Sequence, residues 1–258
     1  MTNALTPEQV GDKTDDAART ATAIPQFTES FDLSLDDAYA AQAHSIGRRL
    51  GRGEQLVGVK MGLTSRAKMV QVGVDEVIWG RLTDAMRLPE GGVLERSCYV
   101  HPRVEPEIAF LIGEDIDEPL SAMEAMARVD GVAAAAEIID SRYENFKFAL
   151  PDVVADNSSS SSFFVGDWHL PDTPVDNLGI VLDVDGRPAE MGSSAAILGN
   201  PVRSLVEATR MVTAAGLTLE AGWVVLAGGA TAAVHLEVGH SYRVTVETLG
   251  AVQFTVAD

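Results

Sequence analysis

The stretch HPRVEPEIAF, residues 101–110, combines an apolar strand pattern with two glutamates. Val104 and Ile108 are typical of a strand that enters a hydrophobic core. Glu105 and Glu107 are two positions apart, so their side chains point to the same face of that strand. Two neighbouring carboxylates repel each other, and burial without a cation favours their protonated forms. The stretch therefore indicates either a strand face exposed to water or a face that binds a cation.

A third acidic residue strengthens the cation hypothesis. GVAAAAEIID, residues 131–140, is apolar from Val132 to Ile139 except for Glu137. A lone glutamate in a buried strand needs a partner, and no lysine or arginine lies nearby on the same face of this segment. If this strand lies beside residues 104–112, three carboxylates without a cationic partner converge. Oxygen ligands without cysteine or histidine suit Mg²⁺ or Mn²⁺ and argue against zinc.

Length and charge limit the classes of function. The chain has 258 residues, 46% of them hydrophobic, which is enough for a sizeable core. No apolar run approaches the roughly 20 residues of a membrane span, and the N-terminal segment lacks the pattern of a signal peptide. A net charge of −19 argues against nucleic-acid and anionic-membrane partners. The single cysteine, Cys98, cannot form an internal disulfide, which suits the cytoplasm.

The organisation of the chain predicts an α+β protein. Ser34 is the expected N-cap of one helix, and Ala38, Ala41, Ile46 and Leu50 are its expected apolar face. We find no repeat and no long linker, so we expect a single domain over 1–258, helical in 1–55 and β-rich in 56–258. The predicted helices are 4–22, 33–53, 119–129 and 202–215. The predicted strands are 56–61, 104–112, 131–140, 161–166, 178–184, 222–227, 241–248 and 251–257.

Lys60 lies in VGVKMGL, between apolar residues and two glycines. Its amine either reaches water along the aliphatic stem or serves as a cation in a cleft, where it holds an anionic substrate or transfers a proton. In the second case we predict that Lys60 faces the metal across the substrate cavity. It should keep its charge there, because nearby acids oppose the desolvation penalty.

The glycine-rich stretch AGGATAAV, residues 227–234, follows an apolar run. It is either an ordinary turn or a group of backbone N–H donors that holds a carboxylate. It lacks the G-K-[ST] ending of a phosphate-binding P-loop.

Several motifs occur together in a characteristic order. GVKMGLTSRAKMVQVGV, HPRVEPEIAF, EIIDSRYENFKF, VVADNSSSS, LGNP and AGGATAAV resemble the 2-oxo-3-hexenedioate (4-oxalocrotonate) decarboxylase family. This family and its sister, the 2-hydroxypenta-2,4-dienoate hydratases, belong to the fumarylacetoacetate hydrolase-like superfamily. The resemblance implies a mixed β-roll with an N-terminal helical part. It also implies a Mg²⁺ or Mn²⁺ site formed by Glu105, Glu107 and Glu137.

The choice between the two sister families depends on short motifs. Hydratases resemble one another in an aspartate at the position that Ile78 occupies within GVDEVIWG, residues 73–80. Asp75 and Glu76 are present, but at other positions. DSRYENFKF and GGATAA are similar to the decarboxylases. The family often has histidine where this chain has Asn200, so this position departs from the family pattern.

The resemblance implies decarboxylation of 2-oxohex-3-enedioate to 2-hydroxypenta-2,4-dienoate and CO₂, in the meta-cleavage degradation of aromatic compounds. It requires no covalent nucleophile and no organic cofactor. Lys60 is the implied catalytic residue, and Leu63 and Ile78 are the expected apolar wall beside the leaving carboxylate. The implied substrate-binding residues are Leu63, Ile78, Asn157, Ser159, Gly229 and Thr231.

Three alternatives stay open from the sequence. The nearest is a 2-hydroxypenta-2,4-dienoate hydratase, and the second is a hydrolase that cleaves a C–C bond in an acylpyruvate. The third is a non-catalytic protein that binds a metal or a ligand. The expected partners are a small dicarboxylate substrate, further copies of the chain in a homo-oligomer, and the hydratase of the same pathway.

Overall fold

The computed structural model describes residues 4–65 and 76–258. Its helices are α1 (Pro7–Thr20), α2 (Leu35–Gly51), α4 (Ala122–Met126), α5 (Leu150–Ala155) and α6 (Pro201–Ala214). Its strands are β1 (Leu56–Gly62), β2 (Ile78–Thr83), β3 (Val93–Glu95), β4 (Arg103–Ile112), β5 (Val129–Ile139), β6 (Ser160–Val165), β7 (Gly179–Val184), β8 (Arg187–Ser193), β9 (Val224–Leu226), β10 (Val234–His235), β11 (Ser241–Val246) and β12 (Gly250–Ala257).

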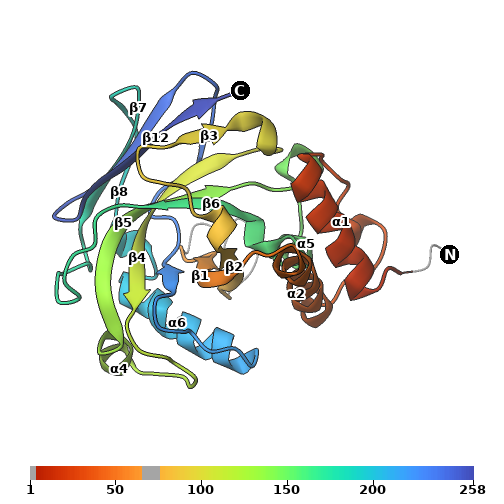
Figure 1. The fold of residues 1–258 in the computed structure, drawn as a ribbon, viewed down its shortest axis with the longest axis horizontal. Coiled ribbons are helices and arrows are strands. Elements are labelled where there is room, and N and C mark those ends of the chain that lie inside the picture. Colours follow the sequence, from red (N-terminus) through yellow and green to blue (C-terminus); the bar gives the residue numbers. More distant parts are fainter. Residues whose placement is uncertain (1–3, 66–75) are drawn as a thin grey trace.

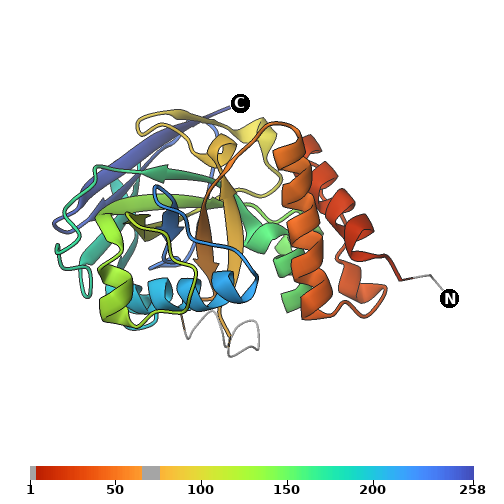
Figure 2. The same cartoon turned by 60° about the horizontal axis from the view of Figure 1, so that its bottom comes forward.

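The strands of these described ranges form two sheets. A seven-stranded sheet has the order β2-β1-β9-β4-β5-β6, with β10 paired to β4. A five-stranded sheet has the order β3-β12-β11-β7-β8. The long, curved strands β4 and β5 lie between the five-stranded sheet, on the left, and helices α1 and α2, on the right (Figure 1). Helices α4 and α6 lie along the lower edge of the molecule in both views (Figures 1 and 2). Mixed sheets with N-terminal helices confirm the predicted α+β class.

The main core lies between the two sheets. Phe164 of β6 stacks on Phe254 of β12 with 4.5 Å between ring centroids, and Tyr242 of β11 stacks on the same ring at 5.4 Å. All three side chains are buried, so this face of the seven-stranded sheet is closed to solvent. Offset aromatic stacking adds about 0.5–1.5 kcal/mol per pair beyond the area buried. A site that binds polar groups is therefore expected on the other face of this sheet.

The other face of the seven-stranded sheet carries the acidic residues. Ala109 of β4 and Leu226 of β9 pack in a second buried cluster with Ile46 of α2. Side chains alternate along a strand, so Glu107 and Glu105 share the face of Ala109. This face looks toward the N-terminal helices, which stand together at one end of the sheet (Figure 2).

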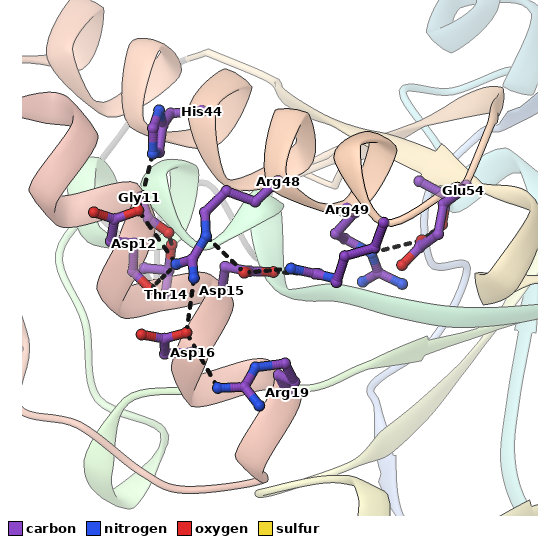
Figure 3. Close-up of polar contacts among 12 residues, drawn as sticks. Gly11, Asp12, Thr14, Asp15, Asp16, Arg19, His44, Arg48, Arg49 and Glu54 are labelled. Carbon is purple, nitrogen blue, oxygen red and sulfur yellow. Dashed lines mark hydrogen bonds and ion pairs between the residues drawn. The ribbon is translucent and has the colours of Figure 1, made fainter.

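Ion pairs join α1 to α2. Asp15 of α1 is 3% exposed, and it accepts bonds of 2.8 and 2.7 Å from the two terminal nitrogens of Arg52. Arg48 of α2 lies 3.2 Å from Asp15 and also pairs with Asp12 and Asp16 (Figure 3). The arginines are partly exposed, so each pair contributes about 1 kcal/mol or less. The network mainly fixes the angle at which α1 rests on α2.

The predicted elements and the observed ones differ in definable ways. Each predicted helix and strand is present with shifted ends, and Ser34 caps α2 as expected by accepting a bond from the Asp37 N–H. Leu50 is 37% exposed, so its assignment to the apolar face of α2 was wrong. Strands β2, β3, β8 and β10 and helix α5 were missed. No helix within residues 4–65 and 76–258 is long and apolar enough to cross a membrane.

Candidate metal centre and active site

The three glutamates meet on neighbouring strands. Strands β4 and β5 are antiparallel, and their register places Glu105 directly opposite Glu137. Glu107 lies two residues further along β4, on the same face. One carboxylate oxygen from each of the three lies within 4.8 Å of the others. Glu107 and Glu137 are fully buried, and Glu105 is 8% exposed.

Lys60 reaches this cluster from β1. Strand β1 runs parallel to β9, which in turn pairs with β4, and this order brings Lys60 to the acidic face. The Lys60 Nζ atom lies 2.9 Å from Glu137 Oε2 and donates a 3.1 Å hydrogen bond to the Ser158 carbonyl. The expectation that the acids lack a cationic partner was therefore wrong. Lys60 stands beside Glu137 rather than across a cavity from it.

Burial and charge act against each other in this cluster. Burial raises the pKa of Glu107 well above its usual range, the neighbouring Glu137 raises it further, and Lys60 opposes the shift. Burial also disfavours the Lys60 ammonium. The carboxylates of Glu137, Glu107 and Glu105 outweigh that penalty and raise the pKa of Lys60 above its usual value. This direction agrees with the prediction that Lys60 keeps its charge.

The carboxylate cluster fits a divalent cation because some of its buried oxygens lack a hydrogen-bond partner among the described residues. Glu107 Oε2 accepts a 2.6 Å bond from the Gly228 N–H, but Glu107 Oε1 has no hydrogen-bond partner among the described residues. Glu137 Oε1 is likewise buried and unpartnered in the described ranges. Native proteins rarely leave buried carboxylate oxygens in this state. Mg²⁺ or Mn²⁺ would supply the contacts that Glu107 Oε1 and Glu137 Oε1 lack among the described residues.

A turn with unusual backbone geometry borders Lys60. Asn157, Ser158 and Ser159 have φ values of 49°, 53° and 58°, which non-glycine residues adopt rarely. The Asn157 amide accepts a 2.8 Å bond from the Arg81 N–H and donates a 2.9 Å bond to the Arg81 carbonyl. The Ser158 hydroxyl donates to the Trp79 carbonyl. The side chains of Asn157 and Ser158 thus tie the turn to β2, and the Ser158 carbonyl is left to bind Lys60.

A buried ion pair also stabilises the turn at residues 157–159. The Arg142 guanidinium pairs with the Asp156 carboxylate, and it donates a 2.6 Å bond to the Asp156 carbonyl and a 3.2 Å bond to the Ser160 carbonyl. A further 2.6 Å bond goes to the Ser161 hydroxyl. Burial raises the pKa of Asp156 to about 7 against the opposing effect of Arg142. This ion pair was not predicted from the sequence. An arginine shortly after Glu137 in the chain was the feature that could have indicated it.

The structure distributes the remaining predicted residues around the cluster. Ser159 is 4% exposed, and its hydroxyl has no partner within the described ranges. Ile78 is buried opposite Gly62, two residues beyond Lys60, and packs in one cluster with Leu63. Gly229 lies in a buried turn whose neighbouring Ala230 donates to the Pro106 carbonyl.

Three other positions make hydrogen bonds within the fold. The Thr231 hydroxyl donates to the adjacent Ala232 carbonyl, and both polar atoms of Asn157 are used by Arg81. The Arg81 carbonyl uses one of the two N–H groups of the Asn157 amide, so the second N–H is left for the predicted substrate hydrogen bond. Asn200 caps α6 by accepting a bond from the Val202 N–H. Of the two acids weighed for a hydratase, Glu76 is exposed and Asp75 lies outside the described residues.

Known proteins resemble this chain in sequence and in structure. The family model of the fumarylacetoacetate (FAA) hydrolase C-terminal region matches residues 55–257. A 4-oxalocrotonate decarboxylase from Pseudomonas sp. is 51% identical over 96% of each chain. A 2-keto-4-pentenoate hydratase from Paraburkholderia xenovorans is 34% identical over 86% of this chain and 84% of its own.

A solved structure matches nearly the whole fold. It is the 4-oxalocrotonate decarboxylase of Pseudomonas putida G7 complexed with magnesium and adipate, with a TM-score of 0.93, 35% identity and 97% coverage of each chain. The same decarboxylase was also solved with calcium and acetate. These matches show that the chain belongs to the fumarylacetoacetate hydrolase family, in the branch that contains the 4-oxalocrotonate decarboxylases.

Proposed function

We propose that the protein is a carboxy-lyase that converts 2-oxohex-3-enedioate to 2-hydroxypenta-2,4-dienoate and CO₂ in the degradation of aromatic compounds. The observation that carries the proposal is the buried cluster of Glu105, Glu107 and Glu137 with Lys60 at its side. Similarity to 4-oxalocrotonate decarboxylases over 96% of the chain supports the reaction. The magnesium and adipate in the P. putida G7 structure support a divalent cation and a dicarboxylate ligand.

The reaction requires an acceptor for the electron pair of the C–C bond that breaks. When CO₂ leaves from C6, the electron pair of the C5–C6 bond delocalises through the double bond onto the 2-oxo oxygen, and a proton from water then completes 2-hydroxypenta-2,4-dienoate. Glu105, Glu107 and Glu137 would hold a divalent cation, which would supply Lewis-acid stabilisation of the developing negative charge. No nucleophile of the protein is required.

Lys60 and the apolar side chains complete the site. The Lys60 ammonium stays charged, so it holds the dianion in place and stabilises the charge that develops on the dienolate. The Ser158 carbonyl and Glu137 fix the position of the ammonium. Ile78 and Leu63 provide an apolar surface that favours the change from a carboxylate to neutral CO₂. The Ser159 hydroxyl, which has no partner within the described ranges, supplies a hydrogen bond to a substrate carboxylate.

One experiment tests the reaction against its alternatives. The purified protein is incubated with Mg²⁺ and 2-oxohex-3-enedioate, and CO₂ release and the products are followed. We expect CO₂, accumulation of 2-hydroxypenta-2,4-dienoate, and loss of activity on addition of a chelator. Glu137→Gln should abolish turnover, whereas Glu29→Gln, an exposed acid of the N-terminal region, should not change it. Hydration of 2-hydroxypenta-2,4-dienoate without CO₂ release would assign the protein to the hydratases instead.

The assembly of the protein is part of the same proposal. We propose that it forms homo-oligomers in the cytoplasm and associates with the hydratase that consumes its product. The single cysteine supports a reducing compartment, and the family resemblance supports the association. Light scattering of the protein alone and after mixing with the purified hydratase measures both assemblies.

A further inference from the structure

Thr64 has a buried hydroxyl close to Gly228, the residue whose N–H binds Glu107. Thr64 is 1% exposed, and its Oγ1 atom has no hydrogen-bond partner among the residues that the structure describes. The Thr64 carbonyl, in contrast, accepts a 2.8 Å bond from the Leu198 N–H. The backbone of Thr64 is therefore fixed, while its hydroxyl is left unsatisfied. An unsatisfied buried hydroxyl lowers the stability of a protein, so its presence calls for a ligand.

The backbone around Thr64 places this hydroxyl close to Gly228. Leu63 turns the chain out of β1 with a φ of 54°, which costs energy for a leucine. Gly228 has a φ of 106°, and a Cβ atom added there would lie 2.0 Å from Thr64 Oγ1. Only glycine leaves room for this approach. The N–H of the same Gly228 donates to Glu107 Oε2 at 2.6 Å, so Thr64 lies against the residue that binds one of the three carboxylates.

We propose that the Thr64 hydroxyl donates a hydrogen bond to a carboxylate oxygen of the substrate, at the 2-oxo acid end that lies on the metal centre. This inference rests on the proposed function, because it takes a 2-oxo dicarboxylate as the ligand. A hydroxyl is suited to this position because it adds a hydrogen bond without adding charge beside three carboxylates. Thr64 thereby orients the 2-oxo acid while Lys60 supplies the positive charge.

The substitution Thr64→Val separates a ligand-binding role from a structural one. Valine keeps the shape of threonine and removes only the hydroxyl, so the variant should fold. Its metal-free form should melt at the same temperature as the wild type or higher, because an unsatisfied buried group is lost. Its affinity for oxalate in the presence of Mg²⁺ should fall about tenfold to a hundredfold, as expected for a lost hydrogen bond to a charged group. Oxalate is the probe because it mimics the 2-oxo acid end.

Thr209→Val is the matched control. Thr209 of α6 is also fully buried, but its hydroxyl donates to the Val206 carbonyl and accepts a bond from the Leu120 N–H. This variant should therefore melt at a lower temperature and bind oxalate as the wild type does. Thr64→Ser, which retains the hydroxyl, should keep most of the oxalate affinity that Thr64→Val loses.

Calorimetric titration and thermal melting give the decisive readings. Wild-type affinity for oxalate in Thr64→Val, or a fall in melting temperature equal to that of Thr209→Val, would overturn the inference. So would a wild-type protein that binds no oxalate with Mg²⁺. Weakened oxalate binding in Thr64→Val supports it even if the wild type releases no CO₂ from 2-oxohex-3-enedioate. The absence of CO₂ release would refute only the proposed reaction.

Discussion

Replacing Arg142 with methionine tests how Lys60 is positioned. Arg142 and Asp156 form an ion pair whose side chains are 4% and 0% exposed. The same guanidinium binds the carbonyls of Asp156 and Ser160, on either side of the turn that presents the Ser158 carbonyl to Lys60. Methionine fills a similar space but removes every one of these bonds. The change therefore releases a turn whose three residues lie in a strained backbone region.

The expected loss of stability in Arg142→Met follows from the burial of its ion pair with Asp156. Removing one partner of a buried ion pair costs about 3–5 kcal/mol, because the other charge is left without compensation. For a chain of this size, each 1 kcal/mol lowers the melting temperature by about 2–4 °C. We expect Arg142→Met to melt roughly 10 °C below the wild type. At temperatures where it is folded, turnover should fall at least tenfold, which corresponds to about 1.4 kcal/mol in the barrier.

Calorimetry and steady-state kinetics check both parts of this prediction. Arg48→Met is the control, because Arg48 is 31% exposed and its partner Asp15 keeps Arg52. It should cost about 1 kcal/mol and leave turnover unchanged. Arg142→Lys should recover part of the stability, because lysine keeps the charge but not the planar fork. The reasoning is refuted if Arg142→Met loses no more stability than Arg48→Met and turns over like the wild type.

Three further predictions concern the cluster itself. Lys60→Met should lower turnover at least tenfold, and its metal-free form should melt earlier in calorimetry because Glu137 loses its counter-ion. The raised pKa of Glu107 means that the metal-free folded protein holds a proton that the unfolded chain releases near pH 4.5, so this group's contribution to stability declines as pH rises through the folded pKa. Mg²⁺ needs the ionised carboxylate, so it should raise the melting temperature more at pH 8 than at pH 5, and Glu107→Gln should remove this difference. Ile78→Asp should slow CO₂ release, because a further anion opposes binding of the dianion, and product analysis should show no gain of hydratase activity.

The sequence was sufficient for the elements that depend on local patterns. Ser34 and the acidic first turn marked α2, and the alternation around Glu105 and Glu107 placed both carboxylates on one strand face. The run of alanines around Glu137 marked β5. The predictions that all of the chain forms one domain and that the named residues bind substrate stay predictions, since they concern properties that these patterns do not fix.

Only the tertiary structure decided which groups meet. The pairing of Glu105 with Glu137 depends on strand register, and a shift by one residue would turn Glu137 to the opposite face. Lys60 reaches Glu137 because β9, from the far end of the chain, lies between β1 and β4. The roles of Arg142 and Thr64 depend on left-handed backbone conformations that no periodic pattern encodes. Local patterns specify faces and ends of elements, whereas long-range packing selects the partners, because each contact joins residues that are distant in sequence.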